Sequence, residues 1–294
     1  MPYPDSRGLR LLIRRWRLFV ALLAAAVLLG TPTAAAVEPS SPTADASAQA
    51  PSAQPNRVAT LNVYNPGGRK PDAAADVLAK YRPQVVGLQE VCQTDVWKIR
   101  DKLTERTGIE YHAKFEYFNH WWHWSHAWRC GEGRLYGIAL LSASPLTEFD
   151  SHTYDEGGTE RRGYVSAKTL VDGVEVRVFN THLAQAGQSS ERRSQVSELV
   201  GEASRHDRAI VLGDFNAEPH YGELAGMWTG FTEADPECGP VYSAACTVTA
   251  NASPRRKKFD YVWINSAFQP GPGVTAVDTW SDHDLVFSDV NNVL

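Results

Sequence analysis

Polar residues follow several predicted β-strands of this chain, at positions where acid–base and metal chemistry could take place. The segment VLGDFN (211–216) is an apolar run that ends in Asp214 and Asn216. Because successive side chains of a strand point to opposite faces, Leu212, Asp214 and Asn216 are expected to share one face. A buried carboxylate without a partner is costly, so such a strand end requires either a loop to cap or a ligand to bind.

The same arrangement recurs in five further segments. Alternation places Asn62 on the face of Val58 and Thr60, and Glu90 on the face of Val86 and Leu88. It likewise places Asn180 and His182 on the face of Val178, and Asp260 on the face of Val262 and Ile264. Asp282 and His283 come directly before the last strand. A single residue of this kind commonly caps a loop, but six such strand ends indicate a common site. Carboxylate and amide oxygens suit Mg²⁺, Mn²⁺ or Ca²⁺, and histidine transfers protons near neutral pH. These residue types predict metal-assisted hydrolysis of a phosphoester, and no P-loop, HExxH or serine nucleophile elbow indicates another chemistry.

The elements that carry these residues are predicted from hydrophobic periodicity. Strands are expected at 57–64, 84–91, 136–142, 163–171, 174–183, 208–215, 259–265 and 284–290. Helices are expected at 72–81, at 94–108 with an end at Gly108, and at 189–206. Asp172-Gly173 predicts a tight hairpin turn. Hairpins combined with strand–helix–strand units predict an α/β fold of mixed sheets with helices packed outside.

Six motifs, TLNVYN, LQEV, NTHLA, GDFNAEP, DYVWIN and SDHD, occur in this order across residues 60–284. In this order they resemble the endonuclease/exonuclease/phosphatase superfamily, which includes pancreatic deoxyribonuclease, abasic-site endonucleases, inositol polyphosphate 5-phosphatases and neutral sphingomyelinases. The resemblance implies a four-layer α/β sandwich, in which two packed mixed β-sheets are flanked by helices. It also implies a divalent-metal site where the strand ends meet.

The resemblance further implies roles for individual residues. Glu90 would be the principal metal ligand, with Asn62 and Asp282 completing or supporting that site. Asp214 and Asn216 would position the attacking water or a second metal and would bind a phosphate oxygen.

The histidines and two further side chains also take implied roles. His283, oriented by Asp260, would act as general base or transition-state stabiliser, and His182 would stabilise the phosphoryl oxygens or protonate the leaving oxygen. Tyr136 is the nearest match to a tyrosine or acidic partner that many family members provide for the first histidine. Arg162 resembles a phosphate-contacting arginine of the nucleases, and the alternative is a solvated charge in a turn.

The N-terminal region is expected to lie outside the folded domain. Five arginines precede the apolar run Leu18–Gly30, and Ala34–Ala36 follow as a cleavage site, so residues 1–36 are predicted to be a signal peptide. The alternative, a membrane anchor, is disfavoured because the run is shorter than the roughly 20 residues of a spanning helix. Residues 37–55 are rich in Ala, Ser and Pro and are predicted to be a disordered linker. The domain would then comprise residues 56–294, in a secreted, extracellular protein.

Charge and cysteine content agree with an exported enzyme. Without residues 1–36 the chain keeps 24 basic and 33 acidic side chains, a net charge of −9, which argues mildly against non-specific binding to nucleic acid. The four cysteines, at 92, 130, 238 and 246, allow three disulfide connectivities. Of these, 238 with 246 and 92 with 130 is favoured, because the first pair closes a short loop that contains Gly and Pro.

The substrate is predicted less sharply than the chemistry. A nuclease acting on DNA or RNA is favoured over a sphingomyelinase, phospholipase or inositol-phosphate phosphoesterase of the same fold, and a non-catalytic binding protein is the least favoured alternative. The Trp- and His-rich segment 112–134 could form core or bind a base, sugar or lipid. The basic run 255–258 could be a solvated face or a phosphate-recognition patch. A monomer without an obligate protein partner is expected.

Overall fold

The computed structural model describes residues 51–64, 68–118, 130–131, 135–252 and 254–293. The predicted signal peptide, residues 37–50 of the predicted linker and most of the segment 112–134 lie outside these ranges. At the end of the predicted linker, the Gln54 amide donates to the Arg82 carbonyl oxygen (2.8 Å), so these last residues contact the domain. Of the helices that are described, none has the length and apolarity that crossing a bilayer requires.

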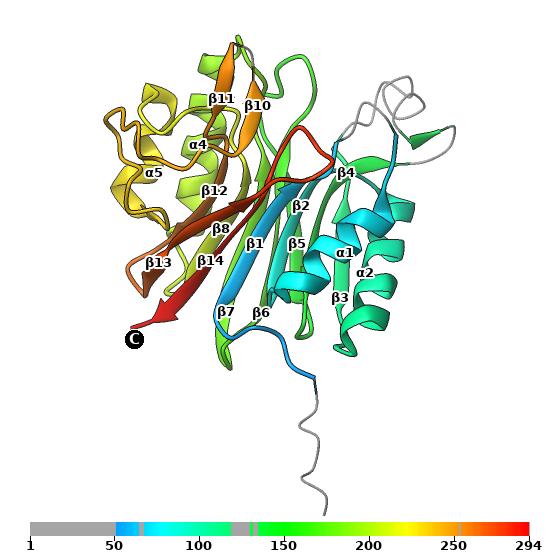
Figure 1. The fold of residues 1–294 in the computed structure, drawn as a ribbon. Coiled ribbons are helices and arrows are strands. Elements are labelled where there is room, and N and C mark those ends of the chain that lie inside the picture. The colour runs from blue at the N-terminus through cyan, green and yellow to red at the C-terminus, as the bar shows by residue number, and fades with distance from the viewer. Residues whose placement is uncertain (1–50, 65–67, 119–129, 132–134, 253, 294) are drawn as a thin grey trace, which may run out of the picture. The chain divides into compact units, whose positions relative to one another are not determined.

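Two mixed six-stranded sheets form the centre of the fold (Figure 1). The first sheet has the order β13 (Phe268–Val277), β14 (Leu285–Asn292), β1 (Arg57–Asn62), β2 (Val85–Cys92), β4 (Tyr136–Ser142) and β3 (His112–Glu116). The second has the order β5 (Thr147–Thr153), β6 (Gly163–Val171), β7 (Val174–His182), β8 (Ala209–Asp214), β12 (Asp260–Ile264) and β9 (Thr232–Glu233). β1 pairs with β2 and β7 with β8 in parallel, and the other neighbours are antiparallel. A separate hairpin joins β10 (Ala250–Ala252) to β11 (Arg255–Lys257).

Helices cover the outer face of each sheet, as Figure 1 shows. Helices α1 (Pro71–Tyr81) and α2 (Gln93–Thr107) share an apolar cluster with β1, β2 and β4. Helix α4 (Ser189–Ala203), the short 3-10 helix η1 (Gly222–Leu224) and α5 (Ala225–Gly230) share another with β7, β8 and β12. A third cluster lies between the sheets and includes Val58, Val85, Val178 and Leu212. The predicted four-layer α/β sandwich is therefore confirmed.

Two of the predicted element ends illustrate how local signals determined the boundaries. Gly108 follows α2 with a left-handed backbone (φ 69°), the conformation that commonly ends a helix. The turn between β6 and β7 places Asp172 (φ 50°) and Gly173 (φ 77°) at positive φ, as a two-residue hairpin requires.

The edge strands were not predicted. β13 has the sequence FQPGPGVTAV, whose prolines and glycines indicate turns; it is tolerated as a strand because it lies at a sheet edge and is irregular between Pro270 and Val274. β5 and β3 are partly exposed edge strands without clear alternation.

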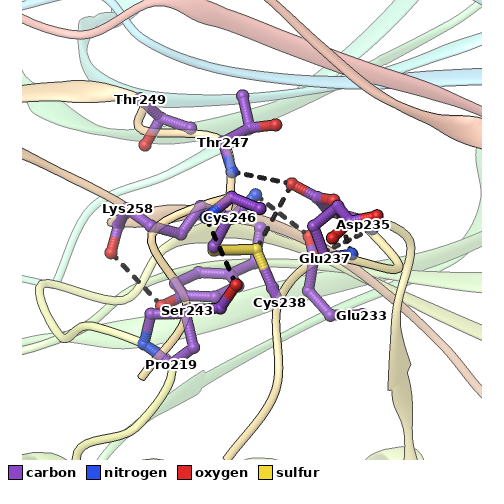
Figure 2. Close-up of a disulfide and its surroundings, with 12 residues drawn as sticks. Pro219, Glu233, Asp235, Glu237, Cys238, Ser243, Cys246, Thr247, Thr249 and Lys258 are labelled. Carbon is purple, nitrogen blue, oxygen red and sulfur yellow. Dashed lines mark hydrogen bonds and ion pairs between the residues drawn. A yellow bond between two sulfur atoms is a disulfide. The ribbon is translucent and has the colours of Figure 1, made fainter. Parts of the chain in front are cut away.

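The two disulfides are those favoured from the sequence. Cys92 is bonded to Cys130, and Cys238 is bonded to Cys246. The first holds the end of β2, and the second closes a loop between β9 and β10 (Figure 2). Both bonds fit an extracellular protein, since disulfides persist in oxidising compartments.

Three of the four side chains of the basic run 255–258 form ion pairs. Arg255 pairs with Glu218 (2.7 Å), Arg256 with Asp284, and Lys258 with Glu233 (3.2 Å). Lys258 and Glu233 are both buried, and burial raises the pKa of Glu233. The run is therefore not uniformly solvated, because Lys258 is buried while Arg255 is exposed.

Replacing Lys258 by methionine is expected to lower the free energy of unfolding by about 3–5 kcal/mol, because Glu233 would lose its cation inside the protein. Chemical denaturation measures the change. The matched control is Lys257→Met, since the Lys257 ammonium lies over the Phe259 ring and should be largely dispensable. The double variant Lys258→Met/Glu233→Gln should recover most of the loss, and an unchanged midpoint for Lys258→Met would contradict the pairing.

Candidate active site

Three polar side chains lie in one row where neighbouring central strands of the second sheet begin or end. His182 ends β7, Asp214 ends β8, and Asp260 begins β12. The strand register places His182 opposite Asp214 and Asp214 opposite Asp260. All three are buried, on the face that also carries the inter-sheet core residues Val178 and Leu212. Alternation predicted this row correctly.

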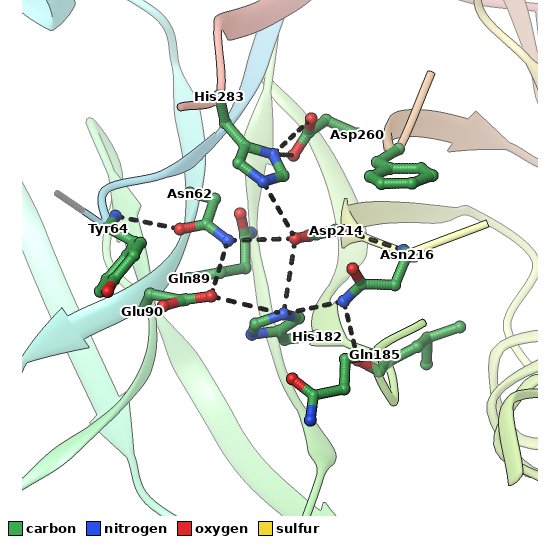
Figure 3. A network of polar contacts seen from close by, with 12 residues as sticks. Asn62, Tyr64, Gln89, Glu90, His182, Gln185, Asp214, Asn216, Asp260 and His283 are labelled. Carbon is green, nitrogen blue, oxygen red and sulfur yellow. Dashed lines mark hydrogen bonds and ion pairs between the residues drawn. The ribbon is translucent and has the colours of Figure 1, made fainter. Parts of the chain in front are cut away.

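Asn62, at the end of β1, connects the first sheet to this row (Figure 3). Its Nδ2 donates to Asp214 Oδ2 (3.0 Å) and to Glu90 Oε1 (3.3 Å). Its Oδ1 accepts from the Tyr64 amide (3.0 Å), and its backbone oxygen accepts from the Ser281 hydroxyl (2.8 Å). The side chain is therefore held at both ends of its amide.

Asn180 crosses between the sheets in the opposite direction. Its Nδ2 donates to the backbone oxygens of Leu88 (3.0 Å) and Ala139 (2.9 Å), and its Oδ1 accepts from Gln89 Nε2 (2.6 Å). Gly87 makes room for it, because a Cβ at that position would lie 2.6 Å from Asn180 Oδ1. The residue is buried and fully bonded, so its role is to join the two sheets beneath the site.

The Glu90 side chain points to the opposite face of β2 from the one that alternation predicts. Val86 and Leu88 pack beneath the outer helices, whereas Glu90 Oε1 lies 3.9 Å from His182 Nε2. The change of face has a local cause: the β2–β4 register shifts between Leu88 and Val91, and Glu90 has a φ of 54°. Such irregularities redirect side chains next to active sites, and a positive φ at a non-glycine residue costs free energy.

Tyr136 and Arg162 also lie in this network. The Tyr136 hydroxyl donates to Glu90 Oε2 (2.5 Å). Arg162 Nη1 lies 2.6 Å from His182 Nδ1, and Arg162 is only 6% exposed, so it is not a solvated turn charge. Because a guanidinium only donates, Nδ1 accepts and the proton of a neutral His182 is assigned to Nε2.

Asn216 approaches the same histidine from the loop after β8. Its backbone has a φ of 50°, a conformation that asparagine adopts more readily than most residues. Its amide N–H donates to Asp214 Oδ1 (2.9 Å), and its Nδ2 donates to the Leu183 oxygen (3.1 Å) while lying 3.1 Å from His182 Nε2.

His283 is held by Asp260. Its Nδ1 lies 2.9 Å and 3.0 Å from the two Asp260 oxygens, and its Nε2 lies 3.7 Å from Asp214 Oδ2. Burial lowers the pKa of His283, but the Asp260 and Asp214 carboxylates raise it, and the resulting pKa is about 10. This environment therefore favours the imidazolium form.

The oxygen-rich centre of the network suits a divalent cation. Burial raises the pKa of Asp214, His283 lowers it and Asp260 raises it, with a resulting pKa of about 7. The protein alone thus stabilises the Asp214 carboxylate poorly, which is the condition that a bound cation would relieve. Ligand atoms of Asp214, Asp260 and His283 lie within 4.8 Å of one another, and Glu90 supplies a further carboxylate beside Asn62.

Asp282 lies in the loop before β14. Its Oδ1 lies 3.3 Å from Ser281 Oγ, and its charge contributes to the raised pKa of His283. Ser281 Oγ also lies 2.8 Å from the backbone oxygen of Tyr64. Ser281 therefore attaches this loop to the end of β1.

A cavity of about 360 Å³ opens beside Glu90. Its lining includes three aromatic residues and two basic ones, which are Tyr64, Tyr136, Trp280, Arg69 and Lys70. Arg69 forms an ion pair with Asp95, and the Lys70 side chain is exposed. A group bound next to Glu90 would thus meet both aromatic and basic side chains.

Two residues of this region were missed by the sequence analysis. Gln89 is buried and donates to Thr60 Oγ1 (2.9 Å) as well as to Asn180, and Ser281 attaches the loop that carries His283. Gln89 alternates with Val85, which lies in the cluster between the sheets, and with Gly87, which faces Asn180, so alternation placed Gln89 on the inter-sheet face, and the prediction followed Val86 and Leu88 to Glu90 instead.

Comparison with known proteins identifies the family to which this chain belongs. The model of the endonuclease/exonuclease/phosphatase family matches residues 59–283. The chain belongs to this family, whose members are phosphoesterase hydrolases that typically use divalent metals. A search of the curated proteins found no match.

Solved structures share the fold at low sequence identity. A family protein from Leptotrichia buccalis has a TM-score of 0.63 at 15% identity, with 80% of this chain and 99% of that chain covered. TDP2 from D. rerio, complexed with a single-strand DNA product, has a TM-score of 0.58 at 18% identity, covering 80% and 98%. A mannosyl-6-phosphatase from Bacteroides thetaiotaomicron has a TM-score of 0.58 at 17% identity, covering 80% and 99%.

Proposed function

We propose that this protein is an exported, divalent-metal-dependent phosphodiesterase that hydrolyses nucleic acid. The observation that carries the proposal is the convergence of strand ends from both sheets on one buried network (Figure 3). A network of carboxylates, amides and two histidines fits phosphoester hydrolysis by positioning and charge stabilisation, without a covalent intermediate.

Each side chain has a proposed task. Glu90 would hold the metal, with Asn62 and Asp282 in support; the cation would neutralise phosphate charge and favour formation of the water nucleophile. Asp214 Oδ2, 3.7 Å from His283 Nε2, would orient the attacking water and accept its proton. His283 would stabilise the negative charge that develops on the phosphoryl oxygens.

His182 is proposed to act at the same phosphate from the opposite side of Asp214, since its Nε2 lies 3.4 Å from Asp214 Oδ2. With its proton on Nε2, His182 can donate to a phosphoryl oxygen or to the leaving oxygen. Arg162, which lies 2.6 Å from Nδ1, would hold the ring in that orientation.

The cavity beside Glu90 supports a nucleic-acid substrate. Aromatic side chains stack on bases, and basic side chains bind the phosphate backbone. The fold shared with a DNA-bound TDP2 is compatible with this choice. Export is supported by the two disulfides and by the layout of residues 1–36.

A phospholipid substrate is the second candidate. The observation that favours it is the exposure of apolar side chains near the Cys238–Cys246 disulfide, where Val241 is 77% and Tyr242 is 59% exposed. Exposed apolar residues of this kind can contact a lipid surface.

The test compares substrates under one set of metal conditions. Purified protein with Mg²⁺, Mn²⁺ or Ca²⁺ is expected to cut plasmid DNA or RNA and to hydrolyse bis-p-nitrophenyl phosphate faster than p-nitrophenyl phosphate. Chelation should abolish these activities, and returning the metal should restore them. Sphingomyelin or phosphatidylinositol cleavage with intact nucleic acid would support the second candidate, preferential monoester hydrolysis would contradict a phosphodiesterase, and activity that persists in chelator would contradict metal dependence.

A further inference from the structure

Thr249 is fully buried and contacts Asp260, the residue that holds His283. It precedes β10, three residues after the disulfide-bonded Cys246 (Figure 2). Its hydroxyl donates to Asp260 Oδ2 (2.7 Å) and accepts from the backbone amides of Phe259 and Asp260 (both 3.0 Å).

The direction of the Thr249 hydroxyl follows from these contacts. A hydroxyl has one hydrogen to donate and two lone pairs to accept with. The two backbone amides occupy the lone pairs, so the hydrogen must point to Asp260 Oδ2. That oxygen also lies 2.9 Å from His283 Nδ1, so Thr249 and His283 bind the same carboxylate atom.

The backbone of Thr249 contacts the segment that carries His283, the partner of Asp260. Its carbonyl oxygen accepts from the Asp284 amide (2.7 Å), and the next residue, Ala250, forms a β-bridge with His283. One residue thus contacts the Asp260 side chain through its hydroxyl and the segment that carries His283 through its backbone.

We infer that Thr249 is a positioning residue that fixes the rotamer of Asp260 and, through it, the orientation of the His283 ring. The inference rests on the proposed function for its effect on rate, and on the hydrogen bonds alone for its effect on His283. Thr249 does not contact the cavity beside Glu90, so a change at this position should affect kcat and leave KM unchanged.

Thr249→Val removes the hydroxyl and keeps the side-chain shape. It is expected to lower kcat by about 10- to 100-fold with little change in KM, because small displacements of a reacting group have effects of this size. Thr249→Ser keeps the hydroxyl and should stay within about threefold of the parent rate, which is below the effect of such displacements. The matched control is Thr169→Val, which removes another buried hydroxyl, bonded to Ser142 Oγ at the far end of β6, and should leave kcat unchanged.

Two further measurements separate positioning from a general loss of structure. In an Asp260→Asn background, Thr249→Val should have almost no additional effect on kcat. In proton NMR, a low-field signal that disappears in His283→Ala reports the His283 Nδ1–H hydrogen bond; Thr249→Val should shift or broaden it, and Thr249→Ser should preserve it. If Thr249→Val does not fold, Thr249→Ala replaces it in every arm.

Several outcomes would overturn the inference. These are an unchanged kcat and NMR signal in Thr249→Val, or a raised KM at constant kcat in that variant. An equal loss of kcat when Thr249→Val is introduced into the parent and into Asp260→Asn would also overturn it. The NMR arm needs no substrate. If no phosphoester is cleaved, the proposed function fails while the effect of Thr249 on His283 is still decided.

Discussion

Replacing His283 by alanine is expected to lower kcat for phosphodiester hydrolysis by about 10²- to 10⁴-fold, the usual contribution of a positioned acid, base or imidazolium. The reason is its place in the network: Asp260 holds Nδ1, and Nε2 is directed toward Asp214. Steady-state kinetics on a diester substrate measures the loss. His206→Ala is the matched control, because His206 follows the end of α4 and pairs with Glu202 of that helix, on the outer side of the second sheet.

The pH dependence distinguishes the two roles that the sequence left open for His283. The carboxylates of Asp260 and Asp214 raise its pKa to about 10 against the effect of burial. The imidazolium is therefore present at neutral pH and is lost as the pH rises through about 10, so a stabilising role predicts a fall in kcat over that range. A kcat that does not fall over that range would contradict the stabilising role, whereas a rise near pH 7 is expected in either case because the Asp214 carboxyl has a pKa of about 7.

Replacing Glu90 by glutamine is expected to weaken Mn²⁺ or Mg²⁺ binding by at least about tenfold and to lower kcat by about 10²- to 10³-fold. The substitution keeps the shape of the side chain and an oxygen for the Tyr136 hydroxyl but removes the charge that would hold the cation. Isothermal titration with the metal and kinetics at saturating metal separate the two effects. Glu198→Gln, on the opposite side of the second sheet, serves as the control.

The same experiment decides between two groups of ligands. Asp214, Asp260 and His283 are close enough to bind an ion, but Asp260 already bonds His283 and Thr249. If Glu90→Gln binds the metal like the parent and Asp260→Asn does not, the cation occupies that buried group and the assignment to Glu90 is wrong.

Much of the fold could be predicted because its signals are local. Period-two alternation located the central strands, and Asp172-Gly173 located the hairpin between β6 and β7. The edge strand β13 was missed because its prolines and glycines are tolerated only where one side of a strand is unpaired.

The candidate site divides in the same way. Asp214, His182 and Asp260 were placed on the correct face because they belong to regular strands that end at one edge of a sheet. Glu90 was given the wrong face because its direction depends on a register shift against β4, a strand more than 40 residues away along the chain. The contact of Arg162 with His182 and that of Lys258 with Glu233 also join distant segments, so no local pattern indicated that both cations are buried there.

The sequence by itself determined the chemical types at the strand ends, the family and the favoured disulfide pairing, because these depend on residue identity, order and spacing. Only the tertiary structure decided which atoms meet. Asn62 reaches Asp214 across the sheets, Glu90 turns toward His182, and Thr249 binds Asp260. Such contacts join residues far apart along the chain, and their distances follow from how the two sheets pack, which local preferences do not specify.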